Sequence, residues 1–443
     1  MARYQKYDLL KESGQRWLGL IPQHWNTSYS KWLFKERNVK AEISNEMLTA
    51  SQKYGVIPQK LFMELEQQKV VQVQTGHDIL KQVKNNDFVI SMRSFQGGIE
   101  YCGYSGAISS AYVPLEPQEN ISLGYYKYLF KSKQYIQALQ STTNLVRDGQ
   151  ALRYSNFLQV RLPVLPVDEA DKIAAFLDYE TVRIDQLIAK QQRLIELLKE
   201  KRQAVISHAV TKGLNPNAPM KDSGVEWLGQ VPDHWECSRV GWLCDVGNGM
   251  TPNRNNTEYW NEGHIPWLNS SKVNDGEVYF AEQFVTETAF AECSLPWVKS
   301  NSVIMAITGE GKTRGTTAIT RIDTTINQHV AYMMPMSECI VPDFLCMWLQ
   351  SQYGRIRFES EGWGSTKAAI TCSDIKAYPI PLPSVPEQID IVERLKASNT
   401  KFDNLMLYAS KQVDLLQERR TALISAAVTG KIDLRDWTPP KEG

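Results

Sequence analysis

The chain has 443 residues, with 49 Lys and Arg balanced by 49 Asp and Glu, and 42% of its residues are hydrophobic. It has no apolar run of the roughly 20 residues that cross a bilayer and no apolar secretion signal, so composition favours a globular protein of two to four domains with no membrane contact. A net charge of zero argues mildly against DNA binding by this chain alone, because phosphate contacts need cationic groups, but it is compatible with binding in a complex whose partners add positive charge.

The first element is an entrance motif at residues 11–25, which read KESGQRWLGLIPQHW. It recurs as KDSGVEWLGQVPDHW at residues 221–235, an offset of 210. A second block, ELLKEKRQAVISHAVT at 196–211, recurs as DLLQERRTALISAAVT at 414–429, an offset of 218. This period is far longer than the roughly 20–50 residues of a solenoid repeat, so the sequence indicates a tandem duplication of a domain plus a helix. The ends of the two copies agree and the middles diverge, which suggests one architecture performing two recognition tasks.

The variable region of each copy predicts a mixed α/β domain. In the first copy, residues 87–93 are typical of a strand and residues 123–140 of a helix. In the second copy, residues 302–307 and 342–358 are the expected counterparts. Turn-rich polar segments separate these elements.

A long helix is predicted to follow each variable region. Residues 168–211 contain no Gly or Pro, and Gly213 supplies a stop; the second helix begins after Pro386 and stops at Gly430. Each helix has roughly 40 residues and a length of about 60 Å. Apolar residues at alternating steps of four and three form an interrupted heptad seam. The expected seam residues are Ile173, Leu177, Ile184, Leu187, Leu194, Leu198, Val205, Ile391, Leu395, Phe402, Leu405, Leu416 and Leu423.

The two helices are expected to pair with each other. An ordinary bundle helix is the alternative, but matching seams in a duplicated chain favour pairing, and pseudo-two-fold symmetry makes the pair antiparallel. The predicted fold is therefore mixed α+β, with two tandem domains separated by two long antiparallel coiled-coil helices. The predicted boundaries are 1–165 for the first domain, 166–215 for its helix, 216–383 for the second domain, 384–434 for its helix and 435–443 for a flexible tail.

Polar loops in both variable regions carry groups suited to nucleic acid. Arg and Lys can hydrogen-bond guanine, Asn and Gln can hydrogen-bond adenine, and glycines permit a close backbone approach. Solvated surface loops are the alternative reading of the same residues. The candidate contacts are Arg93, Ser94, Gln96, Arg147, Asn253, Arg254, Asn269, Lys272, Lys312, Arg314, Gln328 and Lys367.

Two segments superficially resemble catalytic motifs. Residues 306–313, AITGEGKT, fit a relaxed phosphate loop, but the following RGTTAITRI predicts a strand where that motif needs a helix N-terminus. Residues 438–441, TPPK, lack the polar and aromatic residues of the Asn/Asp-Pro-Pro-aromatic motif of DNA amino-methyltransferases. Nucleotide hydrolysis and methyl transfer by this chain are therefore the less favoured alternatives.

The remaining reactive residue types predict no catalytic or metal site. The six histidines form no i, i+4 pairs and no clusters with cysteine. His24 and His234 belong to the repeated Pro-x-His-Trp motif and are expected to pack or cap at each domain entrance. The seven cysteines form no C-x-x-C pair and are unevenly distributed, which argues for a reducing compartment, so we expect a cytoplasmic protein.

These motifs together resemble the type I restriction–modification specificity subunits. The resemblance rests on the two Trp-Leu-Gly-x-x-Pro-x-His-Trp entrances and on the exits at 162–163 and 380–383, each followed by a long helix. In the second variable region, residues 249–252, 265–268 and 327–330 look like one common type of target-recognition domain. The first region departs from that pattern, with Ser-Ser-Ala-Tyr at 109–112 where the second has Asn-Gln-His-Val.

The resemblance implies a non-catalytic subunit that binds double-stranded DNA at a bipartite site. Each domain would read one half-site in the major groove, and the helices would set the gap and dock two modification subunits. Those partners would bind S-adenosylmethionine and methylate adenine N6 after base flipping, and restriction subunits would use ATP and Mg²⁺ to cleave DNA in phage defence. A spacer of about 60 Å matches roughly 18 base pairs. A coiled-coil scaffold that binds only protein is the remaining alternative.

Overall fold

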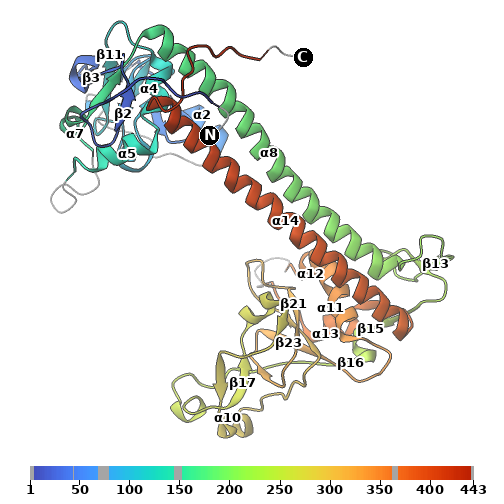
Figure 1. Cartoon of the computed structure of the whole chain (residues 1–443). Coiled ribbons are helices and arrows are strands. Elements are labelled where there is room, and N and C mark those ends of the chain that lie inside the picture. Colours follow the sequence, from blue (N-terminus) through green and yellow to red (C-terminus); the bar gives the residue numbers. More distant parts are fainter. Residues whose placement is uncertain (1–3, 43, 68–78, 144–151, 362–367, 441–443) are drawn as a thin grey trace. The chain divides into compact units, whose positions relative to one another are not determined.

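The computed structural model describes residues 4–42, 44–67, 79–143, 152–361 and 368–440. It divides into two compact units: unit 1 comprises residues 1–192 and 410–443, and unit 2 comprises residues 193–409. Each unit combines one mixed α/β domain with a part of both long helices (Figure 1). The predicted fold class is confirmed.

Unit 1 begins with the entrance motif and closes by pairing distant strands. β1 (Leu10–Glu12) pairs with β2 (Leu20–Pro22), and β3 (Asn26–Tyr29) pairs with β12 (Arg161–Val164), both antiparallel. The main sheet has the order β4-β11-β8-β9. Its strands are β4 (Phe34–Glu36), β8 (Phe88–Ile90), β9 (Glu100–Tyr101) and β11 (Val113–Pro117). Smaller pairs are β5 (Leu48–Ser51) with β6 (Gly55–Pro58), and β7 (Lys81–Val83) with β10 (Gly106–Ile108).

Helices cover the sheet of unit 1 and enclose a largely aromatic core. Phe34, Phe88, Phe130 and Tyr135 are fully buried there, and Phe88 meets both Phe34 and Phe130 edge to face. The helices are α1 (Ser30–Leu33), α2 (Gln59–Glu66), α3 (Ser94–Gly97), α4 (Leu123–Leu129), α5 (Lys133–Gln140) and α7 (Tyr154–Gln159).

Unit 2 repeats this plan. Its main sheet has the order β16-β23-β20-β21-β18, with β16 (Cys244–Asn248), β18 (Glu277–Val278), β20 (Ser302–Ala306), β21 (Thr317–Thr320) and β23 (Val330–Pro335). A second sheet joins β17 (Ile265–Leu268), β19 (Gln283–Val285) and β22 (Thr325–Ile326). The flanking pairs are β13 (Met220–Asp222) with β14 (Gln230–Pro232), and β15 (Glu236–Arg239) with β24 (Pro379–Leu382). The helices are α9 (Val240–Leu243), η2 (Thr257–Tyr259), η3 (Ser270–Asp275), α10 (Glu287–Glu292), α11 (Pro342–Ser351), α12 (Tyr353–Glu359) and α13 (Cys372–Ala377).

The duplication read from the sequence is confirmed in the fold. The elements from β1 to β4 recur as β13 to β16 at an offset of 210, and β12 recurs as β24 at an offset of 218. Between these fixed ends, β4, β11 and β8 have the same sheet order as β16, β23 and β20.

The two helices predicted inside the domains each prove to be a pair of helices. Residues 123–140 form α4 and α5, because Ser132 caps a new helix by accepting a hydrogen bond from Tyr135 N. Residues 342–358 form α11 and α12, which are separated at Gln352. Hydrophobic periodicity continues through both breaks, so it does not reveal them.

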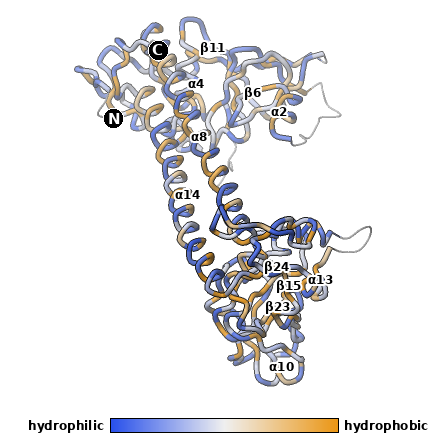
Figure 2. The backbone as a smooth tube through the Cα atoms, turned by 90° about the vertical axis from the view of Figure 1, so that its right-hand side faces the viewer, coloured by the Kyte–Doolittle hydropathy of each residue, from blue (hydrophilic) through white to orange (hydrophobic). Residues whose placement is uncertain are grey.

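The long helices are α8 (Val167–Lys212) and α14 (Val385–Val428). Each ends before a glycine with positive φ, Gly213 at +74° and Gly430 at +68°, a conformation that favours glycine as a helix stop. Arg420 donates to Asp185 at 3.2 Å in unit 1, and Arg202 donates to Asp403 at 2.8 Å in unit 2. Higher numbers on α8 thus meet lower numbers on α14, which confirms the antiparallel pairing. Hydrophobic and hydrophilic residues alternate along both helices (Figure 2).

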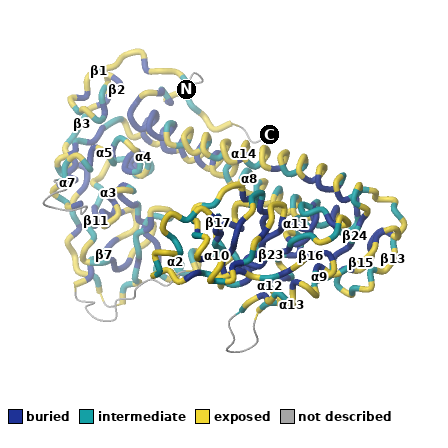
Figure 3. Tube along the Cα trace, turned by 90° about the horizontal axis from the view of Figure 1, so that it is seen from below, coloured by how far each residue is buried: buried dark blue, intermediate teal, exposed yellow. Residues whose placement is uncertain are grey.

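The predicted seam is buried only in part. Ile173, Leu177, Ile184 and Leu423 lie in the core of unit 1, and Ile391, Leu395 and Phe402 are buried in unit 2. Leu198, Val205 and Leu416 are partly exposed. Leu187, Leu194 and Leu405 are 40%, 44% and 51% exposed, so these three members of the predicted interrupted seam are not buried. Buried and exposed residues alternate along both long helices (Figure 3). Within the described residues, these three leucines are only partly covered.

The predicted flexible tail also differs from the structure at residues 435–437. Trp437 packs edge to face on Phe176 of α8, with ring centroids 5.4 Å apart. Arg435 lies over the Tyr7 ring and forms an ion pair with Asp433. These aromatic contacts hold the segment against unit 1; residues 441–443 lie outside the described residues.

Candidate nucleic-acid interface

At each domain entrance the repeated histidine binds a glutamate in the first turn of the following long helix. His24 Nε2 lies 2.7 Å from Glu169 Oε2, and His234 Nε2 lies 2.9 Å from Glu387 Oε2. In unit 1 the same carboxylate also accepts from Tyr7 OH at 2.6 Å and from Trp25 Nε1 at 2.9 Å. The predicted packing role of these histidines is confirmed, and their engagement orients each domain on its helix.

In unit 2, three loops converge beyond the ends of the central strands. Thr251 Oγ1 donates to Gln328, Gln328 Nε2 lies 3.2 Å from His329 Nε2, and His329 Nδ1 lies 2.8 Å from Thr308 Oγ1. These contacts join the loop after β16, the turn before β23 and the second strand-exit loop, which we define as residues 308–315 after β20. A Cβ on Gly249 would lie 1.8 Å from the Ile326 carbonyl oxygen, so glycine is required where two of these segments meet.

Arg254 is held at this surface by two tryptophans. Its guanidinium carbon lies 4.0 Å from the ring centre of Trp260 and 4.7 Å from that of Trp267. One guanidinium nitrogen donates to Gln283 Oε1 at 3.0 Å. The residue remains exposed. A guanidinium stacked on aromatic faces keeps its in-plane N–H donors available, so this arginine is pre-oriented for a planar acceptor.

The structure keeps several other predicted contact residues at the surface. Asn253, Gln328 and Lys312 are exposed in unit 2. Arg93 and Gln96 are exposed in the first strand-exit loop, which we define as residues 93–98 after β8 and which contains the single turn of helix α3. Asn269 is half-buried, and its side chain caps η3 by accepting from Ser271 N at 2.9 Å.

Three predicted contact residues are buried, and this burial argues against their direct contact with a ligand. Lys272 forms ion pairs with Asp275 at 3.2 Å and Glu282 at 2.7 Å. Arg314 is 2% exposed, and Ser94 is fully buried, where its Oγ accepts from Ser91 N at 2.8 Å. The sequence could not separate these from exposed residues, because a polar loop pattern does not report which side chains turn inward. Arg147 and Lys367 lie outside the described residues.

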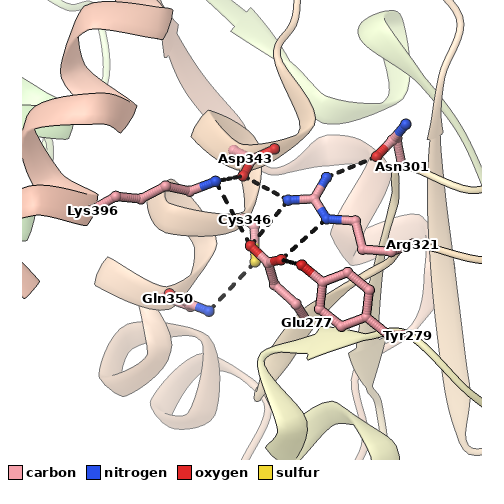
Figure 4. Close-up of polar contacts among 8 residues, drawn as sticks. All are labelled: Glu277, Tyr279, Asn301, Arg321, Asp343, Cys346, Gln350 and Lys396. Atoms are coloured by element: carbon pink, nitrogen blue, oxygen red, sulfur yellow. Dashed lines mark hydrogen bonds and ion pairs between the residues drawn. The ribbon is translucent and has the colours of Figure 1, made fainter. Parts of the chain in front are cut away.

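An ion network joins the second domain to α14 within unit 2 (Figure 4). Arg321 donates to Glu277 at 3.1 Å, to Asp343 at 2.8 Å and to Asn301 at 2.7 Å. Lys396 of α14 donates to Asp343 at 2.5 Å. Burial alone would raise the pKa of Asp343, but the hydrogen bonds from Arg321 and Lys396 outweigh it and lower that pKa. The network was missed from the sequence because its members lie on four separate elements.

The segment that resembles a phosphate loop lacks the required helix. Lys312 and Thr313 are followed by a turn and then by β21, as the sequence predicted. Within the described residues, no group of three or more His, Cys, Asp or Glu side chains is placed to hold a metal ion. In the same part of the chain, no helix is long and apolar enough to span a membrane.

Comparison with known proteins finds type I restriction specificity subunits. Residues 232–406 match the family described as "Type I restriction modification DNA specificity domain". The chain is 23% identical over 361 residues to the type I restriction enzyme MjaVIII specificity subunit of Methanocaldococcus jannaschii, covering 80% of this chain and 81% of that one. It is 22% identical over 355 residues to the EcoBI specificity subunit of Escherichia coli, covering 78% and 73%.

Solved structures share the fold. The HsdS subunit of Thermoanaerobacter tengcongensis matches with a TM-score of 0.57 and 15% identity, covering 93% of this chain and 98% of that one. A chain from a structural study of complex assembly and conformational transition in the type I R-M system matches with a TM-score of 0.69 and 14% identity, covering 92% and 98%.

Proposed function

The chain belongs to the type I restriction–modification specificity subunits, and we propose that each of its two α/β domains reads one half of a bipartite DNA target. The observation that carries the proposal is the duplicated fold with divergent loops. The two domains share the order of three sheet strands and their entrance motifs, while the strand-exit loops differ in length and sequence. A duplicated scaffold whose loops differ between the copies is suited to reading two different sequences.

The exposed donors on these loops support base reading. Arg254, stacked on two tryptophans, presents the paired N–H groups that fit guanine, and Gln328 and Gln96 carry the amide that fits adenine. Lys312 and Arg93 occupy corresponding loops in the two domains and suit base or phosphate contacts.

We further propose that the long helices set the gap between half-sites and bind two modification subunits. The leucines at 194, 405 and 407 are 44%, 51% and 50% exposed, which supports a protein partner on the helices. In this proposal the chain supplies specificity and no catalysis, and S-adenosylmethionine, ATP and Mg²⁺ bind to the partner subunits.

The test is methylome sequencing of cells that co-express the chain with its modification subunit. The expected result is N6-methyladenine at an asymmetric two-part motif with a fixed gap. Absence of new methylation from a complex that demonstrably assembles would contradict the proposal and favour a protein scaffold.

A matched pair of variants tests whether the domains read independently. Lys312→Ala is expected to relax discrimination at one half-site, and Arg93→Ala at the other, each by roughly tenfold if one base contact is lost. Binding of the purified complex to DNA libraries randomised in one half at a time measures both. Equal loss at both halves for either variant would contradict independent reading.

A further inference from the structure

The first strand-exit loop is held by its backbone carbonyl groups. Lys131 Nζ donates to the Gly97 carbonyl oxygen at 3.0 Å, and Gln140 Nε2 donates to that of Phe95 at 2.8 Å. Lys131 precedes α5, and Gln140 is the last residue of α5. Two alternate carbonyls of the loop are therefore bound by these side chains, while the Arg93 and Gln96 side chains stay exposed.

Lys131 is itself fixed by a buried carboxylate. Its Nζ lies 2.6 Å from Glu100 Oε1, and Glu100 is 1% exposed. The second oxygen of Glu100 has no hydrogen-bond partner among the described residues. A buried carboxylate needs a paired cation, so Glu100 holds the lysine at the position where it reaches the loop. The loop ends at Gly98, where the backbone passes so close to Phe130 that a Cβ would lie 2.1 Å from the Phe130 carbonyl oxygen.

The second strand-exit loop is held in the same manner by different residues. Tyr353 OH donates to the Lys312 carbonyl oxygen at 2.6 Å. Arg357 donates to the Gly311 carbonyl oxygen and, at 3.4 Å, to that of Arg314. Tyr353 and Arg357 lie one turn apart on α12, so one face of this helix reaches three carbonyls of the loop.

The two arrangements occupy equivalent places in the duplicated fold. α5 follows α4 in unit 1 as α12 follows α11 in unit 2, and each loop follows the equivalent strand, β8 or β20. The donors differ, a lysine and a glutamine in one copy and a tyrosine and an arginine in the other. In both copies these donors bind only main-chain oxygens of the loop, and a loop of any sequence provides such oxygens. The loop side chains can therefore change while the loop keeps its support.

We propose that Lys131 and Gln140 in the first domain, and Tyr353 and Arg357 in the second, are positioning residues for base reading. The inference rests on the proposed function, since it assigns these residues to the loops that contact DNA. Base discrimination requires donors held within a fraction of an ångström of their acceptors. Removing a side-chain donor frees a loop carbonyl and lets the exposed side chains move, which costs discrimination more than overall binding.

The experiment uses the full chain assembled with its modification subunits. Methylation rates are measured on DNA libraries randomised in one half-site at a time, and non-specific DNA binding is measured alongside. Tyr353→Phe removes only the hydroxyl group, and Arg357→Met removes the second pair of contacts. Both are expected to lower discrimination in one half-site by roughly fivefold to tenfold and to leave the other half and non-specific binding unchanged. Gln140→Leu is expected to affect only the opposite half.

Matched controls lie on the same helices. Arg355→Met removes a cation from α12 that pairs with Glu359 and stacks on Trp227, without a contact to the loop. Gln137→Leu changes an exposed glutamine of α5. Both controls are expected to keep wild-type discrimination. If Arg357→Met impairs folding, Tyr353→Phe still tests the proposal, because it removes only a hydroxyl group.

Two failures are distinguishable. A wild-type complex that methylates DNA without sequence preference would overturn the proposed function itself. A wild-type complex that discriminates, together with Tyr353→Phe and Gln140→Leu variants that discriminate equally well or lose both half-sites alike, would overturn only the positioning role.

Discussion

At the scale of single residues, the two copies differ in how many hydrogen bonds join the domain entrance to its long helix. Glu169 binds His24, Tyr7 and Trp25, and is almost completely buried. Glu387, its counterpart, binds His234 and is partly exposed. Loss of a buried acceptor leaves its donors unsatisfied, whereas loss of an exposed partner is compensated by water.

We therefore expect Glu169→Ala to destabilise unit 1 by about 2–4 kcal/mol and Glu387→Ala to destabilise unit 2 by less than about 1 kcal/mol. Native-state hydrogen exchange of amides in β3 and β15 measures the two effects separately. Equal losses of protection in both units would show that the additional donors of unit 1 contribute nothing.

A second prediction at this scale concerns Gly98. Its φ of +79° and ψ of −172° belong to a region open essentially to glycine alone, and the Phe130 carbonyl oxygen blocks any Cβ. Gly98→Ala is expected to cost about 2–3 kcal/mol and to distort the first strand-exit loop. Gly103→Ala is the control, because nothing lies within 4 Å of the position that its Cβ would take and its φ is not positive. Thermal denaturation of both variants compares them, and similar losses would contradict the argument.

At the scale of elements, the network of Glu277, Arg321, Asp343 and Lys396 ties the second domain to α14 (Figure 4). The hydrogen bond from Arg321 lowers the pKa of Glu277, and hydrogen bonds from Arg321 and Lys396, which outweigh burial, lower that of Asp343. A carboxylate whose folded-state pKa is lowered adds stability that is complete above its unfolded pKa of about 4 and is lost as pH falls through the folded pKa.

Unit 2 is therefore expected to lose stability on acidification below about pH 4, in the window set by these two carboxyl groups. Lys396→Met weakens the lowering of the Asp343 pKa and is expected to flatten the pH dependence of unit 2 in that window. Denaturant unfolding at a series of pH values, followed in unit 2, gives the slope. An unchanged slope in Lys396→Met would mean that the lysine is not coupled to Asp343.

Both long helices were predicted from motifs that recur at fixed offsets, so two copies support each assignment. The entrance and exit strands follow the same repeated motifs but were not predicted as strands, whereas β8 and β20 were predicted from apolar runs inside the divergent regions. The break at Ser132 and the inward turn of Lys272 and Arg314 have no such signal, because they depend on neighbours brought together only by the fold. The loop donors Tyr353 and Arg357 were missed for the same reason: each lies some 40 residues after the carbonyl that it binds.

At the scale of the whole molecule, each unit takes a part of both long helices into its core. Leu423 and Val428 of α14 pack with Ile173 and Leu177 of α8 in the core of unit 1. Ile391 and Leu395 of α14 pack with Ile206 and Val210 of α8 in that of unit 2. Each domain is thus fixed to both helices, as the proposed spacer role of the helices requires.

Leu423→Ala is accordingly expected to destabilise unit 1 by about 2–4 kcal/mol and to leave unit 2 unaffected. Leu405→Ala, on the same helix but half exposed, is the control and is expected to cost less than about 1 kcal/mol. Limited proteolysis followed by mass spectrometry identifies which unit opens. Cleavage in unit 2 of the Leu423→Ala variant would contradict the division of the helices between the two cores.

The core of unit 1 contains residues from both ends of the sequence, from Leu18 to Leu434, whereas the core of unit 2 runs only from Ile206 to Leu395. A ribosome makes the first domain before the second, yet the core of the first domain lacks the last turns of α14 and the following Leu434 until these have been synthesised. Domains usually fold in the order in which they are translated. Here the second domain has its whole core available earlier, so the first domain stays incompletely packed until after the second domain has been translated.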